Sequence, residues 1–341
     1  MSKVRIGING FGRIGRNALK VAFEHREACE IIGINDLTDT KTLALLLKHD
    51  TAYGEYAYDV SYDEKSITVD GVKIDIFAEK DPAMLPWGEH KTDIVIESTG
   101  RFIDPVSAGA HLKAGAKRVI ISAPSKGKDG GPAAPTHVLG VNPSDGSAEI
   151  INNASCTTNC IAPVMQILEN TFGIEMAMMS TIHSYTATQV LQDGPSKDLR
   201  DARAAAQNIV PSTTGAAIAT AESLPVLKGK FDGLSFRVPT IVVSVSDITA
   251  VLKRDVTVEE VNKALTDASK MPQYEGILDV CTEPLVSSDF KGNSHSSIVD
   301  ALLTKVVAGK MVKVVVWYDN EWGYSNRLVE QAIMVGQAAQ G

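Results

Sequence analysis

Cysteine, aromatic residues and positive charge are all scarce in this sequence of 341 residues. It holds four cysteines, 6% aromatic residues, and 33 Lys and Arg against 41 Asp and Glu, which gives a formal net charge of −8. Nucleic acids and anionic membranes attract proteins with excess positive charge, so we expect neither as a partner. Four cysteines in so long a chain do not form the dense framework of a disulfide-stapled domain, and a reducing cytoplasm is the expected compartment.

Long hydrophobic runs are absent as well. The N-terminal segment reaches Gly7 and Asn9 too soon to form the apolar core of a signal peptide. No uninterrupted apolar run approaches the roughly 20 residues that cross a bilayer. Hydrophobic residues nevertheless make up 44% of the chain and charged residues 22%, values that are typical of a globular protein. The length favours two domains.

Strand and helix patterns alternate in the first half of the chain. Continuous apolar strands of this kind are buried on both faces, which indicates a mostly parallel sheet covered by helices. We therefore predict an α/β domain with a Rossmann-type, doubly wound parallel sheet over residues 1–154. Its expected strands are 4–9, 30–35, 93–97, 118–122, 137–141 and 149–152, and its expected helices are 13–24 and 106–114.

The second half has longer strands, such as 241–252 and 312–318, in which apolar and polar residues partly alternate. This pattern predicts an α+β domain over residues 155–320, with a mixed or antiparallel sheet and helices on one side. A helix is expected from Thr257 to Ser269, opened by a capping box with Glu260. A terminal helix within residues 321–341, clearest over 326–337, is expected to pack back on the first domain. The Gly- and Pro-rich stretch 125–135 is a predicted flexible loop.

A glycine-rich motif, Gly10-Phe11-Gly12-Arg13-Ile14-Gly15, joins the first predicted strand to the first helix. Glycines in this context let the backbone approach a dinucleotide pyrophosphate at the amide end of the helix. Asp36 ends the second strand about 20 residues further on, where an acid that binds ribose hydroxyls is expected. Its charge would repel a 2′-phosphate, so the predicted cofactor is NAD. The alternatives are a tight turn without ligand and an ordinary turn acid at Asp36.

Cys156 is the candidate nucleophile, because it lies between a strand and a helix predicted to run to about Asn170. The amide end of a helix favours an anion, so we expect a lowered thiol pKa. Cys160, one turn further on, is interpreted as a buried structural cysteine rather than half of a metal pair or a transient disulfide. Cys29 and Cys281 are expected in the core. No metal site is predicted.

Among seven histidines, His183 is the candidate base for Cys156. It ends an apolar strand-like run, Met176–Ile182, and a polar segment follows it. Active-site residues gather where strands give way to loops. On this pattern alone a structural or solvated histidine remains the alternative.

At these residues the sequence resembles glyceraldehyde-3-phosphate dehydrogenases. The segment around Cys156, Ala-Ser-Cys-Thr-Thr-Asn-Cys, is similar to the nucleophile signature of that family, and the resemblance covers essentially the whole chain. Further matching strings begin at Asn9, Glu97, Ile121, His183, Ser212, Arg237 and Trp317. Residues 155–320 would be the catalytic domain.

The resemblance implies a role for each of several residues. Cys156 would be the nucleophile and His183 its activating acid/base. The substrate phosphate would meet Thr186, Arg237 and Arg200. Inorganic phosphate would meet Ser155, Thr157, Thr214 and Gly215, although Arg237 in a surface ion pair and Thr214-Gly215 as a helix cap are the structural alternatives. The cofactor would contact Gly10, Gly12, Arg13, Ile14, Asp36, Lys80, Ser122, Asn320 and Tyr324.

The implied activity is oxidation of glyceraldehyde 3-phosphate with NAD and inorganic phosphate through a cysteine thioester, by a homotetramer. Leu37 and Pro195 match NAD-specific members of the family, and the loop 125–135 is longer than usual. The segment 186–208 would reach toward a neighbouring subunit's cofactor. Three alternatives are an erythrose-4-phosphate dehydrogenase, an aspartate-semialdehyde-type dehydrogenase and a non-enzymatic NAD-binding regulator. The presence of both Cys156 and His183 argues against the last.

Overall fold

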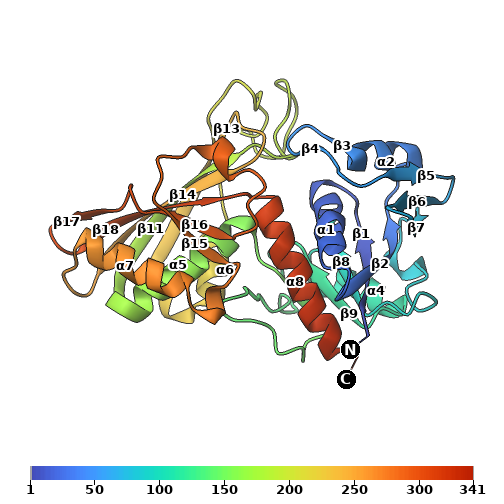
Figure 1. Ribbon diagram of the computed structural model, residues 1–341, viewed down its shortest axis with the longest axis horizontal. Coiled ribbons are helices and arrows are strands. Elements are labelled where there is room, and N and C mark those ends of the chain that lie inside the picture. Colours follow the sequence, from blue (N-terminus) through green and yellow to red (C-terminus); the bar gives the residue numbers. More distant parts are fainter. Residues whose placement is uncertain (1, 341) are drawn as a thin grey trace. The chain divides into compact units, whose positions relative to one another are not determined.

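The computed structural model describes residues 2–340, which divide into two units (Figure 1). Unit 1 comprises the chain up to His137, Pro143–Ala154, and the chain from Ser325 onward. Unit 2 comprises Val138–Asn142 and Ser155–Tyr324. The division differs from the expected one at residues 138–142 and 321–324, which lie in unit 2.

Unit 1 is built on an eight-stranded sheet in the order β10-β9-β8-β1-β2-β7-β6-β5. The first six strands in this order are mutually parallel, which confirms the predicted Rossmann-type sheet. The strands β5 and β6 extend its edge in antiparallel fashion. The bounds are β1 Val4–Asn9, β2 Cys29–Asn35, β5 Val60–Tyr62, β6 Ser66–Val69, β7 Val72–Phe77, β8 Ile94–Glu97, β9 Arg118–Ile121 and β10 Ile150–Asn152, with a separate pair β3 His49–Asp50 and β4 Gly54–Glu55.

The helices of unit 1 are α1 Arg13–Glu24, α2 Thr40–Lys48, α3 Pro105–Ala108 and α4 Ala110–Lys113, with a 3-10 turn at Pro82–Met84. The terminal helix, α8 Trp322–Ala338, packs closely on β1, since a Cβ added at Gly336 would lie 2.2 Å from Val4 Cγ1. The prediction of one helix over 106–114 is wrong: α3 and α4 are separate helices that meet at Gly109, a residue with poor helix propensity.

The predicted strand at 137–141 is also wrong. Residues 138–142 form a turn, in which the backbone N–H groups of Val141 and Asn142 donate to the Val138 carbonyl. The Asn142 side chain accepts from the Val138 N–H at 2.9 Å, and Gly140 takes a φ of +82°. A polar side chain that closes on its own backbone competes with sheet pairing, which explains the failed prediction.

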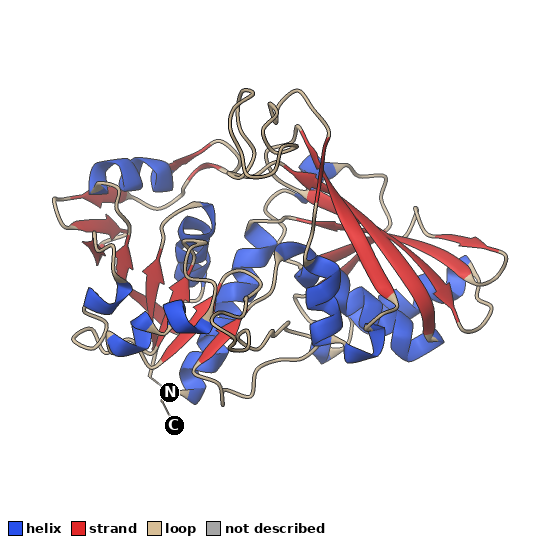
Figure 2. Cartoon of the chain, turned by 180° about the vertical axis from the view of Figure 1, so that it is seen from behind, coloured by secondary structure: helices blue, strands red, loops and turns tan. Residues whose placement is uncertain are grey.

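Unit 2 contains a second eight-stranded sheet in the order β12-β13-β11-β14-β18-β16-β15, with β17 paired to β18. Parallel and antiparallel pairs both occur, as predicted. The helices lie together on one face of this sheet (Figure 2). The strands are β11 Ile174–Ser184, β12 Val210–Ser212, β13 Phe231–Val238, β14 Ser244–Leu252, β15 Leu278–Cys281, β16 Ser297–Asp300, β17 Lys305–Val307 and β18 Met311–Tyr318, and the helices are α5 Cys156–Phe172, α6 Ala216–Ser223 and α7 Val258–Ser269, with 3-10 turns at Pro225–Leu227, Pro272–Tyr274 and Ser287–Phe290.

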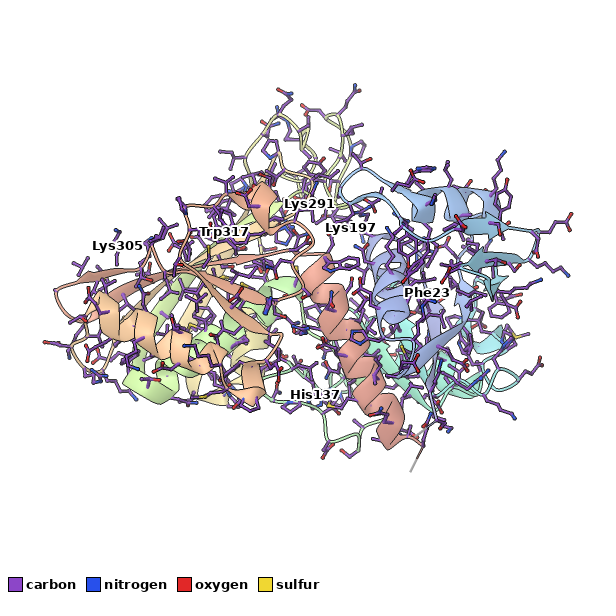
Figure 3. The ribbon with its side chains drawn as sticks, viewed as in Figure 1. Phe23, His137, Lys197, Lys291, Lys305 and Trp317 are labelled. Carbon is purple, nitrogen blue, oxygen red and sulfur yellow. The ribbon has the colours of Figure 1, made fainter. Side chains whose placement is uncertain are left out.

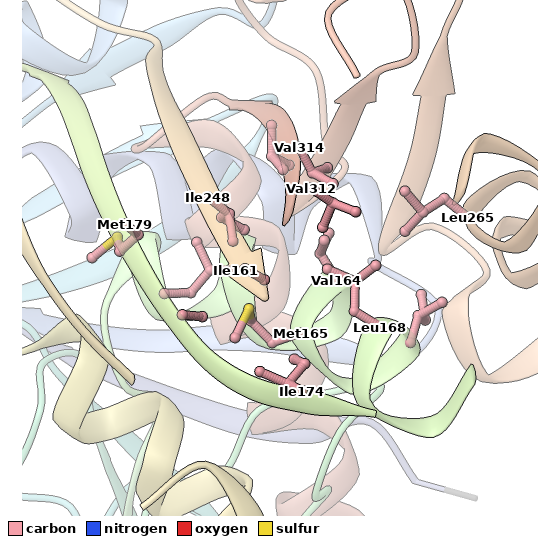
Figure 4. Packing of buried hydrophobic residues seen from close by; sticks show 14 of the residues in the cluster. Ile161, Val164, Met165, Leu168, Ile174, Met179, Ile248, Leu265, Val312 and Val314 are labelled. Carbon is pink, nitrogen blue, oxygen red and sulfur yellow. The ribbon is translucent and has the colours of Figure 1, made fainter. Parts of the chain in front are cut away.

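The core of unit 2 fixes the position of α5. Ile161, Val164, Met165 and Leu168 of this helix are at most 1% exposed and pack with apolar side chains of the sheet (Figure 4). Each fully buried side chain of this size contributes about 1.5–3 kcal/mol to stability. The N-terminus of α5 is therefore held firmly.

The opposite face of the sheet carries Trp317 of β18, labelled in Figure 3. Its ring stacks on Phe290 at 5.2 Å between centroids, and its indole N–H donates to Asp300 at 3.1 Å. Within residues 2–340, no helix combines the length and the apolar character needed to cross a membrane.

Candidate active site

Cys156 is the first residue of α5, at the point where the chain turns sharply into the helix. Ser155 is the N-cap, and its hydroxyl accepts from the Thr158 N–H at 3.1 Å. Ala154, just before the cap, has a φ of +54°, an unusual conformation for a residue with a Cβ. Strained backbone of this kind is typical of functional turns.

The structure brings Cys156 together with His183. The cysteine Sγ lies 3.4 Å from Nε2 of His183, the penultimate residue of β11. On the other side of the ring, Nδ1 is 2.6 Å from the Ser184 carbonyl oxygen. The candidate nucleophile, the candidate base and a group that can orient this base are therefore in line.

Arg237 of β13 lies against the same imidazole, a contact that the sequence analysis did not foresee. Its Nη1 is 2.6 Å from His183 Nδ1 and 3.3 Å from the Ser184 carbonyl oxygen. The register of the parallel pair β11–β13, in which His183 faces Arg237, produces this proximity. Burial, together with the positive charge of Arg237, lowers the pKa of His183 to about 3, so the ring is neutral at pH 7.

The expected low pKa of Cys156 is contradicted. Burial raises the pKa of this thiol above its ordinary value, while the charge of Arg237 and hydrogen bonds from Thr157 and the Cys156 backbone lower it by less. Loss of hydration outweighs the favourable end of the helix here. The resting site therefore holds a neutral thiol beside a neutral imidazole.

Tyr318 contacts the segments that carry Cys156 and His183, and the sequence analysis did not predict this role. Its hydroxyl is 2.9 Å from Thr157 Oγ1 and 2.8 Å from Thr181 Oγ1, so it links α5 to β11. Its ring meets the His183 ring edge-on at 6.0 Å. The side chain is 1% exposed. Its place within the matching string that begins at Trp317 was the available signal.

Asn320, expected to contact the cofactor, has its side-chain orientation fixed. Its Oδ1 accepts from the Ser244 hydroxyl at 3.0 Å, and that hydroxyl in turn accepts from the Ser184 N–H at 3.1 Å. The oxygen of the amide is therefore engaged within unit 2, next to the residue that follows His183. Tyr324, also expected to contact the cofactor, is 4% exposed.

The remaining candidate phosphate residues lie in two places in unit 2, after the end of β11 and beside β13. Thr186 follows the end of β11 and bonds Gln189 through both its N–H and its hydroxyl. Arg200 and Thr214 line a cavity of about 660 Å³ beside β13. Gly215 is the exposed N-cap of α6, and the Thr214 hydroxyl accepts from the Ala216 N–H at 3.1 Å.

The candidate cofactor pocket is a cavity of about 540 Å³ in unit 1, at the carboxyl ends of the parallel strands. Gly10 has a φ of +92°, and a Cβ there would lie 2.7 Å from the Thr99 nitrogen, so only glycine fits. A Cβ at Gly12 would meet nothing within 4 Å, which leaves the backbone open to a ligand. These features suit a dinucleotide. Of the predicted cofactor residues, the pocket is lined by Gly10, Gly12, Asp36 and Lys80.

Of the other predicted cofactor residues in unit 1, Arg13 and Ser122 have local partners. The Arg13 guanidinium is 2.6 Å from the Asp50 carboxylate. Ile14, on the first turn of α1, is half-buried. Ser122 follows β9 and donates its N–H to the Glu97 carbonyl. Asp36 itself accepts from the Phe11 N–H at 2.8 Å, so it also shapes the glycine-rich turn.

Comparison with known proteins decides the family. The model of the glyceraldehyde 3-phosphate dehydrogenase C-terminal domain matches residues 155–320, and that of the NAD binding domain matches residues 4–105. The chain belongs to the glyceraldehyde-3-phosphate dehydrogenase family. It is similar to the curated glyceraldehyde-3-phosphate dehydrogenase of Geobacillus stearothermophilus, with 52% identity over 335 residues, which cover 97% of this chain and 98% of the relative. It shares 50% identity with the glyceraldehyde-3-phosphate dehydrogenase of Streptomyces coelicolor over 336 residues, which cover 98% of each chain.

Membership of the glyceraldehyde-3-phosphate dehydrogenase family confirms the expected oxidoreductase class, the NAD cofactor and the two-domain fold class. The structure also confirms that Cys160 is buried and that Cys29 is a core residue. The prediction for Cys281 is wrong, because it is only partly buried near the end of β15, with its Sγ 3.4 Å from the Glu283 carbonyl oxygen. Among the described residues, no group of three or more His, Cys, Asp or Glu could hold a metal ion.

Proposed function

We propose that this chain catalyses the phosphorylating oxidation of D-glyceraldehyde 3-phosphate to 1,3-bisphosphoglycerate, with NAD⁺ and inorganic phosphate. The observation that carries the proposal is the 3.4 Å contact between Cys156 Sγ and His183 Nε2 at the N-terminus of α5. Family membership supplies the substrate class.

His183 acts first as the base. The reaction uses the tautomer with the proton on Nδ1, which the Ser184 carbonyl oxygen 2.6 Å away accepts, so that Nε2 presents its lone pair to the thiol. Arg237, whose Nη1 is also a donor 2.6 Å from Nδ1, then directs its N–H groups to the substrate phosphate assigned to it below. The Cys156 S–H bond breaks as the sulfur bonds to the aldehyde carbon, and the proton passes to Nε2. Because the resting pair is neutral, the thiolate forms in this step rather than in advance. His183 then passes this proton from Nε2 to the former aldehyde oxygen, which gives a neutral thiohemiacetal on Cys156 and frees the imidazole to act as a base again.

The second step oxidises this adduct. When bound, NAD⁺ accepts the hydride that leaves the former aldehyde carbon. His183 removes the proton of the thiohemiacetal hydroxyl, so that a thioester remains on Cys156. Within this chain, Asn320 is the residue we assign to hold the carboxamide of the cofactor, because its side-chain oxygen is fixed by Ser244. Tyr318 keeps α5 and β11 in place meanwhile.

Inorganic phosphate then attacks the thioester, and the Cys156 sulfur leaves with a proton from His183. We assign this phosphate to Ser155, Thr157, Thr214 and Gly215, and the substrate phosphate to Thr186, Arg200 and Arg237. The support is their chemistry: hydroxyls, an exposed helix N-terminus at Gly215 and guanidinium groups all bind phosphate oxygens. Arg237 also lies against His183, so a substrate phosphate bound to Arg237 would hold the substrate close to the base.

A steady-state assay tests the proposal. Purified protein is given glyceraldehyde 3-phosphate or erythrose 4-phosphate, with NAD or NADP, in the presence or absence of phosphate. We expect NAD reduction that requires phosphate and prefers glyceraldehyde 3-phosphate. Oxidation that is independent of phosphate would overturn the proposed phosphorolysis. A preference for erythrose 4-phosphate would favour an erythrose-4-phosphate dehydrogenase.

We propose further that the enzyme is a homotetramer and works in a reducing compartment such as the cytoplasm. Leu191 and Leu199, in the segment 186–208, are each 83% exposed in the single chain. On the outer face of β11, Met176 and Met178 are 58% and 63% exposed. Apolar side chains gathered in this way favour contact with another copy. The compartment follows from the need to keep the Cys156 thiol reduced.

A further inference from the structure

A line of buried polar side chains crosses the carboxyl ends of β8, β1 and β2, three neighbouring strands of unit 1. Asn9 of β1 is in register with Glu97 of β8 on one side and with Asn35 of β2 on the other. Asn35 donates to Asn9 at 2.7 Å, and Asn9 donates to Glu97 at 2.5 Å. All three are at most 5% exposed. We call these three residues the polar ladder.

Both carboxylate oxygens of Glu97 are fully engaged by hydrogen-bond donors. One carboxylate oxygen accepts from the Thr99 N–H at 2.8 Å and from the Thr99 hydroxyl at 2.5 Å. The other accepts from Asn9 and lies 3.1 Å from His111 Nε2. A carboxylate offers about four acceptor positions, and all are used here.

His111 is locked in one tautomer. Trp87 donates its indole N–H to His111 Nδ1 at 3.0 Å, and an indole N–H cannot accept. Nδ1 therefore carries no proton, and Nε2 carries the one that His111 donates to Glu97. Both Trp87 and His111 are fully buried. In this tautomer the Asn9 amide nitrogen, 3.4 Å from Nε2, makes no hydrogen bond with it because both groups are donors, and both donate to Glu97 instead.

The polar ladder ends on both walls of the cofactor pocket. At one end Glu97 holds Thr99, and at the other Asn35 forms two hydrogen bonds with the backbone of Glu79, at 2.8 and 2.9 Å. Thr99 and Glu79 face the pocket, as do Asn9 and Asn35 themselves. The distance between the walls is therefore set by side chains beneath the pocket.

We infer that Glu97 is a positioning residue for NAD, which acts through Asn9 and Thr99, with His111 and Trp87 as its support. The inference rests on the proposed function for the identity of the cofactor. It assigns to Glu97 no contact with the reacting atoms. Its effect should appear in NAD affinity and not in the chemical step at Cys156.

The geometry also makes glutamate, rather than glutamine, necessary at this position. In Glu97→Gln, the new amide would direct donors at groups that are themselves donors, Thr99 on one side or Asn9 and His111 on the other. Asn9 cannot rotate its amide without losing Asn35, and His111 cannot change tautomer without losing Trp87. Buried donors without an acceptor are costly, so the walls should shift.

The test compares Glu97→Gln with Asp93→Asn, a matched control four residues earlier in the chain. Asp93, just before β8, is also a buried carboxylate and accepts from the Arg5 N–H, Lys117 and Gln340, but it does not line the pocket. His111→Phe, which removes one supporting bond, is the second test variant. For each protein we would measure the dissociation constant for NAD by calorimetry, the thermal midpoint, and kcat and KM for glyceraldehyde 3-phosphate at saturating NAD.

For Glu97→Gln we expect the dissociation constant for NAD to rise about tenfold or more, with a smaller rise for His111→Phe. The kcat and the KM for the aldehyde should change by less than about twofold, since a positioning effect on one ligand acts on its binding. Asp93→Asn should lower the thermal midpoint while NAD affinity stays near that of the wild type.

Three outcomes would overturn the inference: unchanged NAD affinity in Glu97→Gln, equal losses of affinity in Glu97→Gln and Asp93→Asn, or, if Glu97→Gln does not fold, unchanged affinity in His111→Phe. A failure of the proposed function is separate, because it would appear as a wild-type protein that binds NAD but does not oxidise the aldehyde.

Discussion

At the scale of single residues, Cys156 and His183 do not form a thiolate–imidazolium ion pair before the substrate arrives. Burial raises the pKa of the thiol, and burial together with Arg237 lowers the pKa of the imidazole, so both groups are neutral at pH 7. Such a pair protects the cysteine from indiscriminate reaction, since the thiolate is the reactive form. It also makes proton transfer to Nε2 part of the attack on the aldehyde.

Replacing Cys156 by serine should abolish turnover and leave NAD binding intact. A serine hydroxyl is a far weaker nucleophile and cannot form the thioester. The measurement is kcat with glyceraldehyde 3-phosphate beside NAD titration. Cys281→Ser is the control, because Cys281 lies partly exposed near the end of β15, and its activity should match the wild type. Appreciable turnover in Cys156→Ser would refute the mechanism.

The buried neutral His183 should make the fold sensitive to acid. Its pKa is lowered from 6.5 to about 3 in the folded chain, so between these values the unfolded chain binds more protons. Stability contributed by the neutral ring is then present above the unfolded pKa and is lost as pH falls, by up to about 1.4 kcal/mol per pH unit. Urea unfolding at several pH values between about 4 and 7 should show a shallower dependence for His183→Asn. Parallel curves for the two proteins would contradict the assignment.

At the scale of elements, α5 and α7 begin where a side chain satisfies a first-turn N–H group. Ser155 caps α5, and Thr257 with Glu260 forms a reciprocal capping box at α7. The sequence pattern predicted the start of both helices correctly, because a cap is a local interaction. The helix predicted across Gly109 failed for an equally local reason, since a glycine favours a break that apolar periodicity does not reveal.

Thr257→Ala should destabilise unit 2 by about 1 kcal/mol, since it removes the acceptor for the first-turn N–H of Glu260. The effect should appear as a lower thermal midpoint with unchanged kcat, because α7 carries none of the proposed catalytic residues. Lys263→Ala in the same helix, where only an exposed ion pair with Asp267 is lost, should cost less than about 0.5 kcal/mol. Equal losses in the two variants would argue against the cap.

At the scale of the whole molecule, unit 2 covers only one face of its sheet with helices (Figure 2). The other face exposes Met176 and Met178 of β11 and Leu234 of β13. The proposed tetramer would bury such side chains, which individually contribute about 1.5–3 kcal/mol when fully removed from water.

Met178→Glu should therefore weaken assembly while each subunit still folds, because the new charge would have to be buried in the contact. Light scattering should report a tetramer for the wild type and smaller species for the variant. Val106→Glu is the control, since Val106 of α3 is 59% exposed, close to the 63% of Met178. A tetramer that persists in Met178→Glu would place the subunit contact elsewhere.

Much of the site could be found from the sequence, because its signals are short-range. The glycine-rich turn with Asp36, the capped cysteine of α5 and the histidine at the end of β11 each depend on residues close together in the chain. Apolar runs predicted five of the six parallel strands, all but β7, for the same reason: the period and length of a run are visible in the sequence itself. The family resemblance rested on these strings as well.

Only the tertiary structure decided what surrounds those residues. Strand register placed Arg237 against His183 and Glu97 beside Asn9, across separations of 54 and 88 residues. The packing of α5 on the sheet placed Tyr318 against Thr157, 161 residues away. Burial then reversed the expected pKa of Cys156, because the loss of water around a group depends on the packing of distant segments. The sequence therefore determined the chemistry of residues that are close together in the chain. The protonation states of the site residues and their partners from distant segments were decided by the tertiary structure.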